Sequence, residues 1–338
     1  MIRDVAASLL VAFNYLVVAY FVLHNAIQLG LIGLAWKDIG HHQRRVEIGD
    51  LDHVYGNPLT PSITLIVAAY NEEVGLASGV RAILGLHYPS FDVVIVDDGS
   101  TDGTFAELER AFGLVPSPKV MSTEITTIGR VLSTWVGEAG RLTVIRKENA
   151  GSRADALNVG LNAATGTLVC MVDADSMLEE DALLRVVRPF IDDPLRVVAT
   201  GGVICIGNGC EFVGGRLRRV AMPRAWTARI QVVEYLRSFL LGRVGWSKLD
   251  GLLIISGAFG LFRRDVVMEL GGLDPQSLGE DAELVARLHH DLRRQKRDYR
   301  VVFVSDPVCW TEVPESVAIL ARQRRRWSRG LAQVLWRH

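Results

Sequence analysis

The chain carries no charged residue between Val5 and Trp36, and this stretch limits what its N-terminus can form. The stretch is longer than the roughly 20 residues that span a bilayer as a helix, and longer than the roughly 7 to 15 residues of a signal-peptide core. A buried helix of a water-soluble core is the alternative, but such helices are seldom apolar over this length. We therefore predict a retained transmembrane anchor, with its flank, over residues 1–40.

Basic residues flank this stretch unequally. Lys37, Arg44 and Arg45 follow it, whereas only Arg3 precedes it. Because basic residues collect on the cytoplasmic side of a membrane span, we expect the rest of the chain at the cytoplasmic face of the cell membrane, in contact with membrane lipids.

The composition narrows the possible partners. A net charge of −1 argues against a general nucleic-acid-binding protein. The cysteines have neither zinc-ligand spacing nor the spacing of a disulfide framework, so we expect small core residues in a reducing compartment. They are Cys170, Cys205, Cys210 and Cys309.

After a polar linker over residues 41–61, short apolar runs alternate with helical patterns. The runs are ITLIVAAY (63–70), DVVIVDDGS (92–100), LTVIRKEN (142–149), TLVCMVDAD (167–175) and VVATGGV (197–203). They are rich in β-branched residues and apolar on both faces, which is typical of a parallel sheet covered by helices. We predict an α/β domain over residues 62–312, with ligands bound beyond the carboxyl ends of the strands.

Two segments interrupt this alternation. The stretch from Gly113 to Gly140 is rich in Ser, Thr and Pro and predicts an insertion loop. From Arg216 to Arg243, arginines alternate with apolar residues at helical spacing. That pattern fits a helix lying on the membrane surface, and equally an ordinary amphipathic packing helix.

Asp173 and Asp175 end one of the apolar runs, in the sequence CMVDADSM. Side chains two residues apart on a strand point the same way, so both carboxylates can converge on one point. Hard oxygen ligands at one point suit a divalent cation such as Mg²⁺ or Mn²⁺. A surface turn is the alternative, because Asp is common after strands.

Other polar signatures follow the first two runs, as AAYNEE and VDDGSTDGT. The second makes a tight turn into a helix, and no Gly-x-Gly-x-x-Gly dinucleotide motif is present. A carboxylate at Asp97 could accept a hydrogen bond from the imide N–H of a uracil. A capped turn without a ligand explains the same residues.

Arg153 lies in the first turn of a predicted helix, after a glycine-containing turn. Helix N-termini attract anions, and a cation there favours a diphosphate ligand. A solvated arginine is the alternative. Glu280 and Asp281 also begin a predicted helix, where an acid can act as a cap or as the general base that deprotonates an acceptor hydroxyl.

The end of the chain, residues 313–338, is predicted as a basic amphipathic helix at the membrane interface. It contains RQRRRW, in which arginines surround Trp327. Such a helix often contacts anionic lipid head groups, but its arginines could also face a diphosphate and its indole a sugar ring. In ISGAFGLFRRD, Phe259 could pack on a sugar, or the segment could be a buried strand.

Taken together and in order, these blocks resemble the inverting family 2 glycosyltransferases of GT-A fold, and among them the membrane-bound synthases of cellulose, chitin, hyaluronan and poly-N-acetylglucosamine. The resemblance implies a metal-dependent hexosyltransferase. Asp173 and Asp175 match the metal-binding motif, Asp281 the catalytic base and Asp97 the acid that contacts the nucleotide base. Gln323, Arg326 and Trp327 match the Gln-x-x-Arg-Trp signature of chain-extending members.

The resemblance also gives the expected set of site residues. Those assigned to catalysis are Asp281 and Glu280, and those assigned to the acceptor are Phe259 and Trp327. Those assigned to the nucleotide sugar are Ala68, Tyr70, Glu72, Asp97, Asp98, Arg153, Asp173, Gln323 and Arg326. The donor is expected to be a UDP-sugar and the acceptor a polysaccharide or a lipid-linked sugar.

Two departures from the family pattern matter. Arg153 stands where relatives often carry Lys, which keeps the charge but changes its geometry. Relatives continue into further membrane helices, whereas this chain ends soon after Trp327, so we expect either a fragment or a membrane partner subunit. Two other functions stay open: transfer of a single sugar to a lipid phosphate, and a non-catalytic nucleotide-sensing module.

Overall fold

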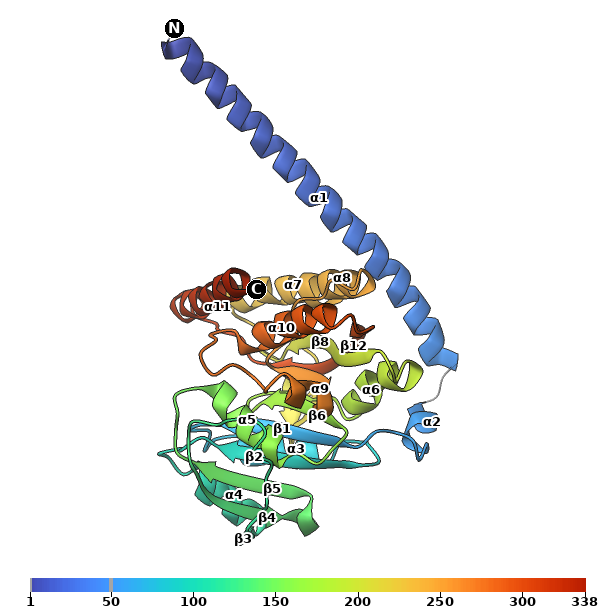
Figure 1. Ribbon diagram of the computed structural model, residues 1–338, viewed down its shortest axis with the longest axis vertical. Coiled ribbons are helices and arrows are strands. Elements are labelled where there is room, and N and C mark those ends of the chain that lie inside the picture. The colour runs from blue at the N-terminus through green and yellow to red at the C-terminus, as the bar shows by residue number, and fades with distance from the viewer. Residues whose placement is uncertain (1, 49–50) are drawn as a thin grey trace.

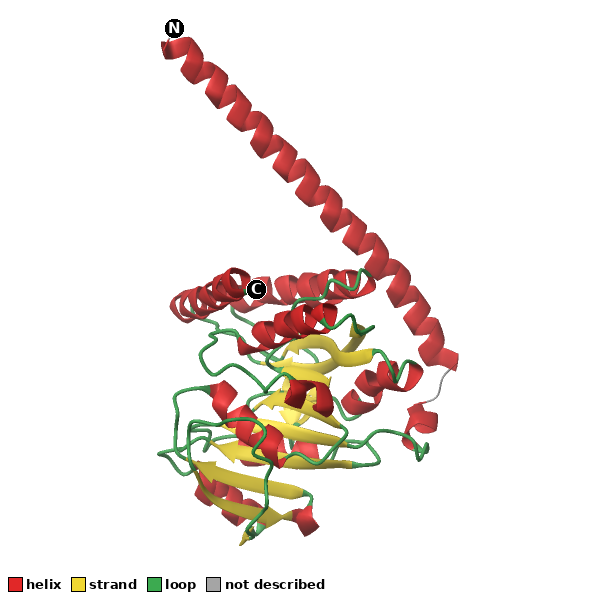
Figure 2. Cartoon of the chain, viewed as in Figure 1, coloured by secondary structure: helices red, strands yellow, loops and turns green. Residues whose placement is uncertain are grey.

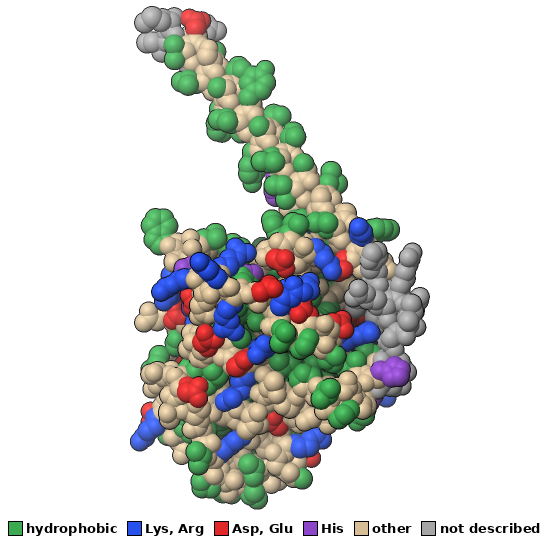
Figure 3. All heavy atoms as spheres, turned by 45° about the vertical axis from the view of Figure 1, so that its right-hand side comes forward, with side chains coloured by type: hydrophobic (Ala, Val, Ile, Leu, Met, Phe, Trp, Pro, Cys, Tyr) green, Lys and Arg blue, Asp and Glu red, His purple; other side chains and the backbone are tan. Residues whose placement is uncertain are grey.

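The computed structural model describes residues 2–48 and 51–338. Helix α1 (Ile2–Ile48) leaves the body of the protein and carries the N-terminus away from it (Figure 1). Within it, Ala7–Gly40 is long and apolar enough to cross a membrane, with a mean hydropathy of 1.8. Hydrophobic side chains line its projecting part (Figure 3). The helix continues past the boundary expected at residue 40, and positions 49–50 of the expected linker lie outside the described residues.

The lower part of α1 packs against the body. Leu31 and Ala35 are buried, and a Cβ on Gly245 of α8 (Val244–Lys248) would lie only 2.8 Å from the carbonyl oxygen of Leu31. Lys248 also forms an ion pair with Asp38 at 2.6 Å. The absence of a side chain at Gly245 lets the two helices come into contact, so α1 packs against α8.

The body is built on one sheet, in the strand order β3-β4-β5-β2-β1-β6-β11-β8-β12-β7. The strands are β1 (Ile63–Ala69), β2 (Phe91–Asp97), β3 (Val115–Pro116), β4 (Val131–Gly137), β5 (Leu142–Lys147), β6 (Leu168–Asp173), β7 (Met177–Leu178), β8 (Val197–Ile206), β11 (Phe259–Arg263) and β12 (Arg300–Thr311). Strands β5, β2, β1 and β6 run parallel, and so do β8 and β12, whereas β4, β11 and β7 are antiparallel to their neighbours.

Helices surround the sheet (Figure 2). They include α2 (Leu51–Tyr55), α3 (Leu76–Leu84), α4 (Thr104–Phe112), α5 (Arg153–Ala163), α6 (Ala182–Asp192), α9 (Arg264–Glu269) and α10 (Glu280–Arg294). Alternate residues of β2 point to opposite faces: Val94 and Val96 pack with Ala156 of α5, whereas Val93 and Ile95 join the main core with Leu108 of α4. The sheet is therefore covered on both faces, which confirms the predicted α/β class.

Both interrupting segments differ from the expectation. The stretch from Gly113 to Gly140 contains the antiparallel strands β3 and β4 and a short 3₁₀ turn, η1 (Glu138–Gly140), so it extends the sheet edge and is not only a loop. The stretch from Arg216 to Arg243 begins as strand β10 (Arg216–Arg219), paired with β9 (Glu211–Val213). Only its later part is helical, as α7 (Trp226–Tyr235) and the π-helix η2 (Leu236–Arg243).

Large hydrophobic side chains are exposed on α7, η2, α8 and the terminal helix α11 (Val317–Arg337). They include Trp226, Ile230, Val233, Trp246, Leu331 and Trp336. These helices lie at the end of the body from which α1 projects (Figure 1), and basic side chains mix with hydrophobic ones at that end (Figure 3). Among the cysteines, Cys170 and Cys309 are completely buried, as expected for core residues.

Candidate active site

The polar signatures meet at the carboxyl ends of β2, β1 and β6. Strand β1 lies between the other two, with Ala69 opposite Asp97 and Ala68 opposite Asp173. Two strand spacings separate Asp97 from Asp173, which is about 10 Å. The register thus brings two of the predicted carboxylates to one edge of the sheet, on either side of Ala68.

The loops that leave β1 and β2 are joined to each other. Asn71, which has a positive φ of 56°, donates its backbone N–H to Ser100 Oγ at 3.0 Å and accepts the N–H of Thr101 at 2.8 Å. The carboxylate of Glu73 accepts the N–H of Gly103 at 3.2 Å. These bonds fix the loops that carry Tyr70 and Glu72; Tyr70 is half exposed at the rim.

Asp97 and Asp98 have different partners. Asp97 is 1% exposed and accepts the N–H of Ser100 at 2.9 Å, with Arg146 3.5 Å away. Asp98 forms an ion pair with Lys147, which is completely buried and also lies 3.0 Å from Asp155. The carboxylate of Asp98 therefore points toward Lys147. In this structure it is not oriented to contact a nucleotide sugar, contrary to the expectation from the sequence.

We predict that Lys147→Met lowers the free energy of unfolding by about 3–5 kcal/mol, since removing one partner leaves two buried carboxylates without their cation. The measurement is urea unfolding in detergent, followed by tryptophan fluorescence. Lys296→Met, at an exposed position, is the control. Equal midpoints for the two variants would show that the buried cluster contributes nothing to stability.

Arg153 connects the separate parts of the site. Its guanidinium lies 2.5 Å from Asp173 and 2.9 Å from Glu280, and it donates to the carbonyl oxygen of Gly257 at 3.0 Å. Burial opposes its charged form, but the carboxylates of Asp173 and Glu280 outweigh that effect and raise the pKa of Arg153. The predicted metal ligand, the predicted diphosphate ligand and the start of α10 are thus in direct contact.

Negative charge is concentrated around Asp175. Desolvation and the neighbouring charge of Asp173 raise the pKa of Asp175, and burial together with the charge of Asp175 raises the pKa of Glu72. Among the described residues, no group of three or more His, Cys, Asp and Glu side chains forms a complete metal site. Two neighbouring carboxylates fit Mg²⁺ or Mn²⁺ when diphosphate oxygens supply further ligands, as is usual for Mg²⁺ in phosphate sites.

Asp281 lies in the first turn of α10, close to Arg153. Its Oδ1 accepts the N–H of Ala282 at 2.8 Å, whereas its Oδ2 accepts no hydrogen bond from the described residues. A Cβ on Gly257 would lie 3.5 Å from Oδ2 and 3.8 Å from the guanidinium of Arg153. Because Gly257 has no side chain, none covers this oxygen from that side.

The structure does not bring the remaining predicted residues into this cluster. Within residues 2–48 and 51–338, no hydrogen bond or ion pair joins Gln323, Arg326 or Trp327 to Asp173 or Asp281. Trp327 instead lies under the guanidinium of Arg324, 4.6 Å from the ring centre. Phe259 is completely buried; it pairs with Val172 of β6 and its ring belongs to the main core, so it offers no surface to an acceptor sugar, contrary to the expectation.

Sequence reasoning missed Arg243 as a neighbour of the site. Its guanidinium lies 3.6 Å from the ring centre of Phe239, and its Nε and Nη1 atoms are buried without a hydrogen-bond partner among the described residues. Burial lowers the pKa of Arg243 to about 10, although the charge of Asp281 acts in the opposite direction. Its position within an apolar helical pattern concealed this proximity, because sequence spacing does not show which face of η2 turns inward.

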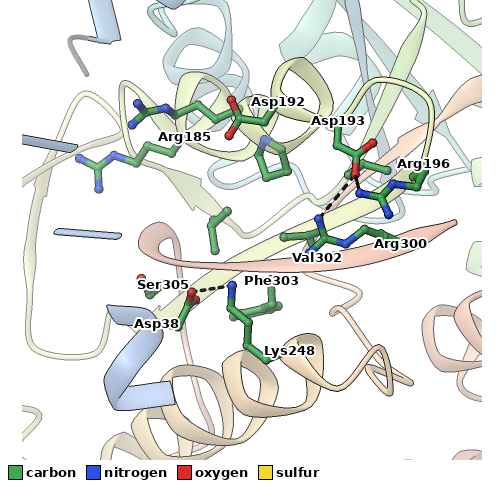
Figure 4. A pocket seen from close by; sticks show the side chains of 14 residues that line it. Asp38, Arg185, Asp192, Asp193, Arg196, Lys248, Arg300, Val302, Phe303 and Ser305 are labelled. Atoms are coloured by element: carbon green, nitrogen blue, oxygen red, sulfur yellow. Dashed lines mark ion pairs between the residues drawn. The ribbon is translucent and has the colours of Figure 1, made fainter. Parts of the chain in front are cut away.

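A separate cavity of about 480 Å³ lies between α1, α6, α8 and β12 (Figure 4). None of the predicted site residues lines it. Its charged side chains pair with one another: Lys248 with Asp38 at 2.6 Å, and Arg196 with Asp193 at 2.7 Å. The cavity is therefore distinct from the cluster around Arg153.

A mainly parallel sheet, with carboxylates at the ends of β2 and β6 and an acid at the start of α10, is the arrangement expected of a glycosyltransferase of GT-A fold. Residues 61–330 match the family described as glycosyltransferase like family 2, and the chain belongs to that family. Curated relatives include the poly-β-1,6-N-acetyl-D-glucosamine synthases of Staphylococcus epidermidis, 27% identical over 275 residues, and of Staphylococcus aureus, 29% identical over 277 residues. Each match covers 81% of this chain but 56% of the relative, so the chain spans a little over half their length.

Two solved structures share the fold. The mannosyltransferase PcManGT from Pyrobaculum calidifontis, in complex with GDP-Man and Mn²⁺, gives a TM-score of 0.56 at 22% identity and covers 92% of this chain and 75% of its own. Glucosyl-3-phosphoglycerate synthase from Mycobacterium tuberculosis, in complex with Mn²⁺, UDP and phosphoglyceric acid, gives 0.50 at 15% identity, with coverages of 84% and 82%. At these identities the likeness concerns the fold, and it confirms the expected GT-A architecture.

Proposed function

We propose that the chain is the catalytic part of an inverting, metal-dependent hexosyltransferase, which moves a sugar from a UDP-sugar to a growing polysaccharide at the cytoplasmic face of the cell membrane. The observation that carries the proposal is the position of Arg153, 2.5 Å from Asp173 and 2.9 Å from Glu280. Arg153 joins the carboxylate pair suited to a metal to the helix that begins with Asp281. A donor diphosphate and an acceptor hydroxyl would meet between them.

The donor would lie along the carboxyl ends of β2, β1 and β6. Its base would be near Asp97 and its diphosphate near Asp173 and Arg153, a separation that suits the two ends of a nucleotide diphosphate. The half-exposed Tyr70 would border the base. Because the curated relatives are poly-β-1,6-N-acetyl-D-glucosamine synthases, UDP-N-acetylglucosamine is the first donor to test.

Asp175, with Asp173 nearby, would hold Mg²⁺ or Mn²⁺. A cation bound there would neutralise charge on the diphosphate and make UDP a better leaving group. Arg153 supplies a fixed positive charge to the same diphosphate and stabilises the charge that develops on departure.

Asp281 is the proposed general base. Its Oδ2 takes the proton of the acceptor hydroxyl while that oxygen attacks the anomeric carbon from the face opposite UDP, so the configuration inverts. Glu280 is bound to Arg153, and we assign it to holding that arginine rather than to taking the proton. Gln323 and Arg326 are proposed for the diphosphate and Trp327 for the acceptor on the strength of their sequence motif.

The membrane location is part of the proposal. It is supported by the apolar span in α1 and by the exposed hydrophobic side chains of α7, η2, α8 and α11 beside basic residues. Helices with this composition lie in the headgroup region of a bilayer. The proposal also includes export of the polymer across the membrane, together with any partner subunit that export requires.

The direct test of donor choice is release of nucleotide by the detergent-solubilised protein with Mn²⁺ or Mg²⁺. The panel contains UDP-N-acetylglucosamine, UDP-glucose, UDP-glucuronate and GDP-mannose. We expect UDP-N-acetylglucosamine to give the highest rate of nucleotide release among these donors. Binding of UDP without release from any donor would favour a nucleotide-sensing module instead.

We predict that Arg153→Lys lowers kcat/KM for the donor by about 10- to 100-fold. Lys keeps the charge but cannot contact Asp173, Glu280 and the Gly257 carbonyl together, and each hydrogen bond to a charged group is worth about 1.5–3 kcal/mol. The measurement is kcat/KM for the donor. Arg130→Lys, which alters a surface pair with Glu148, is the matched control, and equal effects of both substitutions would remove Arg153 from the site.

A further inference from the structure

The last helix of the chain contacts the loop that precedes Asp281. This loop, residues 274–279, is the second part of the segment that connects α9 to α10, and its last residue, Gly279, precedes the first turn that contains Asp281. Resting on the proposed function, we infer that the second half of α11 positions the catalytic base through this loop, with Gly330 and Gln333 as the positioning residues.

Gln333 binds the loop with both ends of its amide. Its Oε1 accepts the backbone N–H of Leu278 at 3.0 Å, and its Nε2 donates to the carbonyl oxygen of Gln276 at 3.0 Å. A side chain that both accepts from and donates to the same loop fixes its distance from the helix and its orientation. Leu278 is three residues from Asp281, so this bond acts close to the base.

Gly330 lets the helix and the loop approach. A Cβ at this position would lie 3.0 Å from the backbone nitrogen of Gly279 and 3.2 Å from its Cα. These distances are below ordinary van der Waals separation, so any side chain at Gly330 would displace the backbone just before Asp281.

Two further polar contacts extend this interaction. Arg337 forms an ion pair with Asp274 at the start of the loop, and His338 lies 3.2 Å from Glu283 in the first turns of α10. The segment from Asp274 to Glu283 is therefore in contact with four residues at the end of the chain: Gly330, Gln333, Arg337 and His338.

On its other side, the loop is bound by the residue that precedes Arg153. Ser152, which precedes Arg153, donates its hydroxyl to the carbonyl oxygen of Pro275 at 2.9 Å. The loop thus lies between the helix that carries Arg153 and the helix that carries RQRRRW. A shift of α11 would change the position of Asp281 relative to the donor while leaving Asp173 and Asp175, on β6 and just beyond it, in place.

In this arrangement, α11 has a second function besides presenting an exposed basic face: it positions Asp281. A displacement of about 1 Å in a catalytic group can cost roughly 100-fold in rate, so the few tenths of an ångström imposed by a side chain at Gly330 should be measurable. The effect should fall more on kcat than on the KM for the donor, because Asp173, Asp175 and Arg153 lie outside the loop, although Arg153 is joined to the start of α10 through Glu280.

The test uses three variants of the full chain. Gln333→Met removes both bonds to the loop, and Gln333→Glu keeps an oxygen that can accept from Leu278. Gly330→Ala pushes on Gly279 while replacing glycine by a better helix former. Gln295→Met, which removes a surface bond to Glu269 at the other end of α10, is the matched control.

We expect Gln333→Met and Gly330→Ala to lower kcat by about 10-fold, with the KM for the donor changed by less than about 2-fold. Gln333→Glu should recover part of the loss. The melting temperature is measured for each variant, and a loss of kcat at an unchanged melting temperature cannot be attributed to unfolding. Hydrogen exchange at the amide of Leu278 should accelerate in Gln333→Met, independently of any activity.

Unchanged kcat in both Gln333→Met and Gly330→Ala would overturn the inference, provided that the unmodified chain transfers sugar. A parallel fall in stability and kcat, with the same loss in Gln295→Met, would also overturn it, since α11 would then serve only packing. If the unmodified chain transfers no sugar, the proposed function fails, and unchanged exchange at Leu278 would show separately that the loop is not held by Gln333.

Discussion

Asp281→Asn should lower sugar transfer by about 10²- to 10⁴-fold while leaving the affinity for UDP nearly unchanged. A positioned general base typically contributes a factor of this size, and asparagine has no basic oxygen to accept the acceptor proton. The substitution keeps the shape of the side chain and its bond to the N–H of Ala282. The measurement is the initial rate of transfer at saturating donor, together with UDP binding by calorimetry.

Two variants control this result. Asp291→Asn changes an acid on the same helix, where His290 is the one hydrogen-bond partner of the carboxylate among the described residues, and should keep the normal rate. Glu280→Gln weakens the contact with Arg153 and should raise the KM for the donor more than it lowers kcat. If Asp281→Asn keeps the rate of the unmodified chain, the base is another group; if Glu280→Gln loses kcat instead, the two acids have exchanged roles.

Asp175→Asn should shift the dependence of transfer on Mn²⁺ or Mg²⁺ to higher metal concentration, with a loss of about 10³-fold in rate at a metal concentration that saturates the unmodified chain. A divalent cation stabilises the charge on a leaving diphosphate by several kcal/mol, and each 1.36 kcal/mol changes the rate tenfold. The pKa of Asp175 is raised by desolvation and by the charge of Asp173, and a bound cation would relieve this repulsion. The measurement is transfer as a function of metal concentration.

Asp298→Asn, at an exposed acid far along the chain, is the control for nonspecific loss of charge. Adding excess Mn²⁺ should restore part of the activity of Asp175→Asn, because Asp173 and the diphosphate still supply ligands. Full activity of Asp175→Asn in the presence of a chelator would contradict a metal at this site.

The edge of the sheet that carries the site was predictable because it depends on short-range patterns. The apolar runs set the parallel strands, and the carboxyl ends of parallel strands meet at one edge. Asp97 and Asp173 each end such a run, so their side-by-side arrangement across Ala68 follows from strand order. The long apolar helix α1 was predictable for the same reason, since the length and composition of the uncharged run indicate a helix long enough to cross a membrane.

The interactions between distant segments were not predictable from local pattern. Whether Phe259 faces the core or the site depends on the pairing of β11 with β6, and the sequence of β11 is apolar on both faces. The strands β3 and β4 lie within a stretch whose many Ser, Thr and Pro residues resemble a loop. Arg153 and Glu280, 127 positions apart, and α11 with the loop before Asp281 meet only through the tertiary fold.

The reaction proposed for this chain is inverting, metal-dependent transfer of a hexose. It is tested most directly by the configuration of the product formed from UDP-N-acetylglucosamine and Mn²⁺, determined by NMR of the anomeric proton and carbon. We expect a β-linked sugar from the α-linked donor, with no product when the metal is chelated. An α-linked product, or transfer that is unaffected by chelation and by Asp281→Asn, would contradict it.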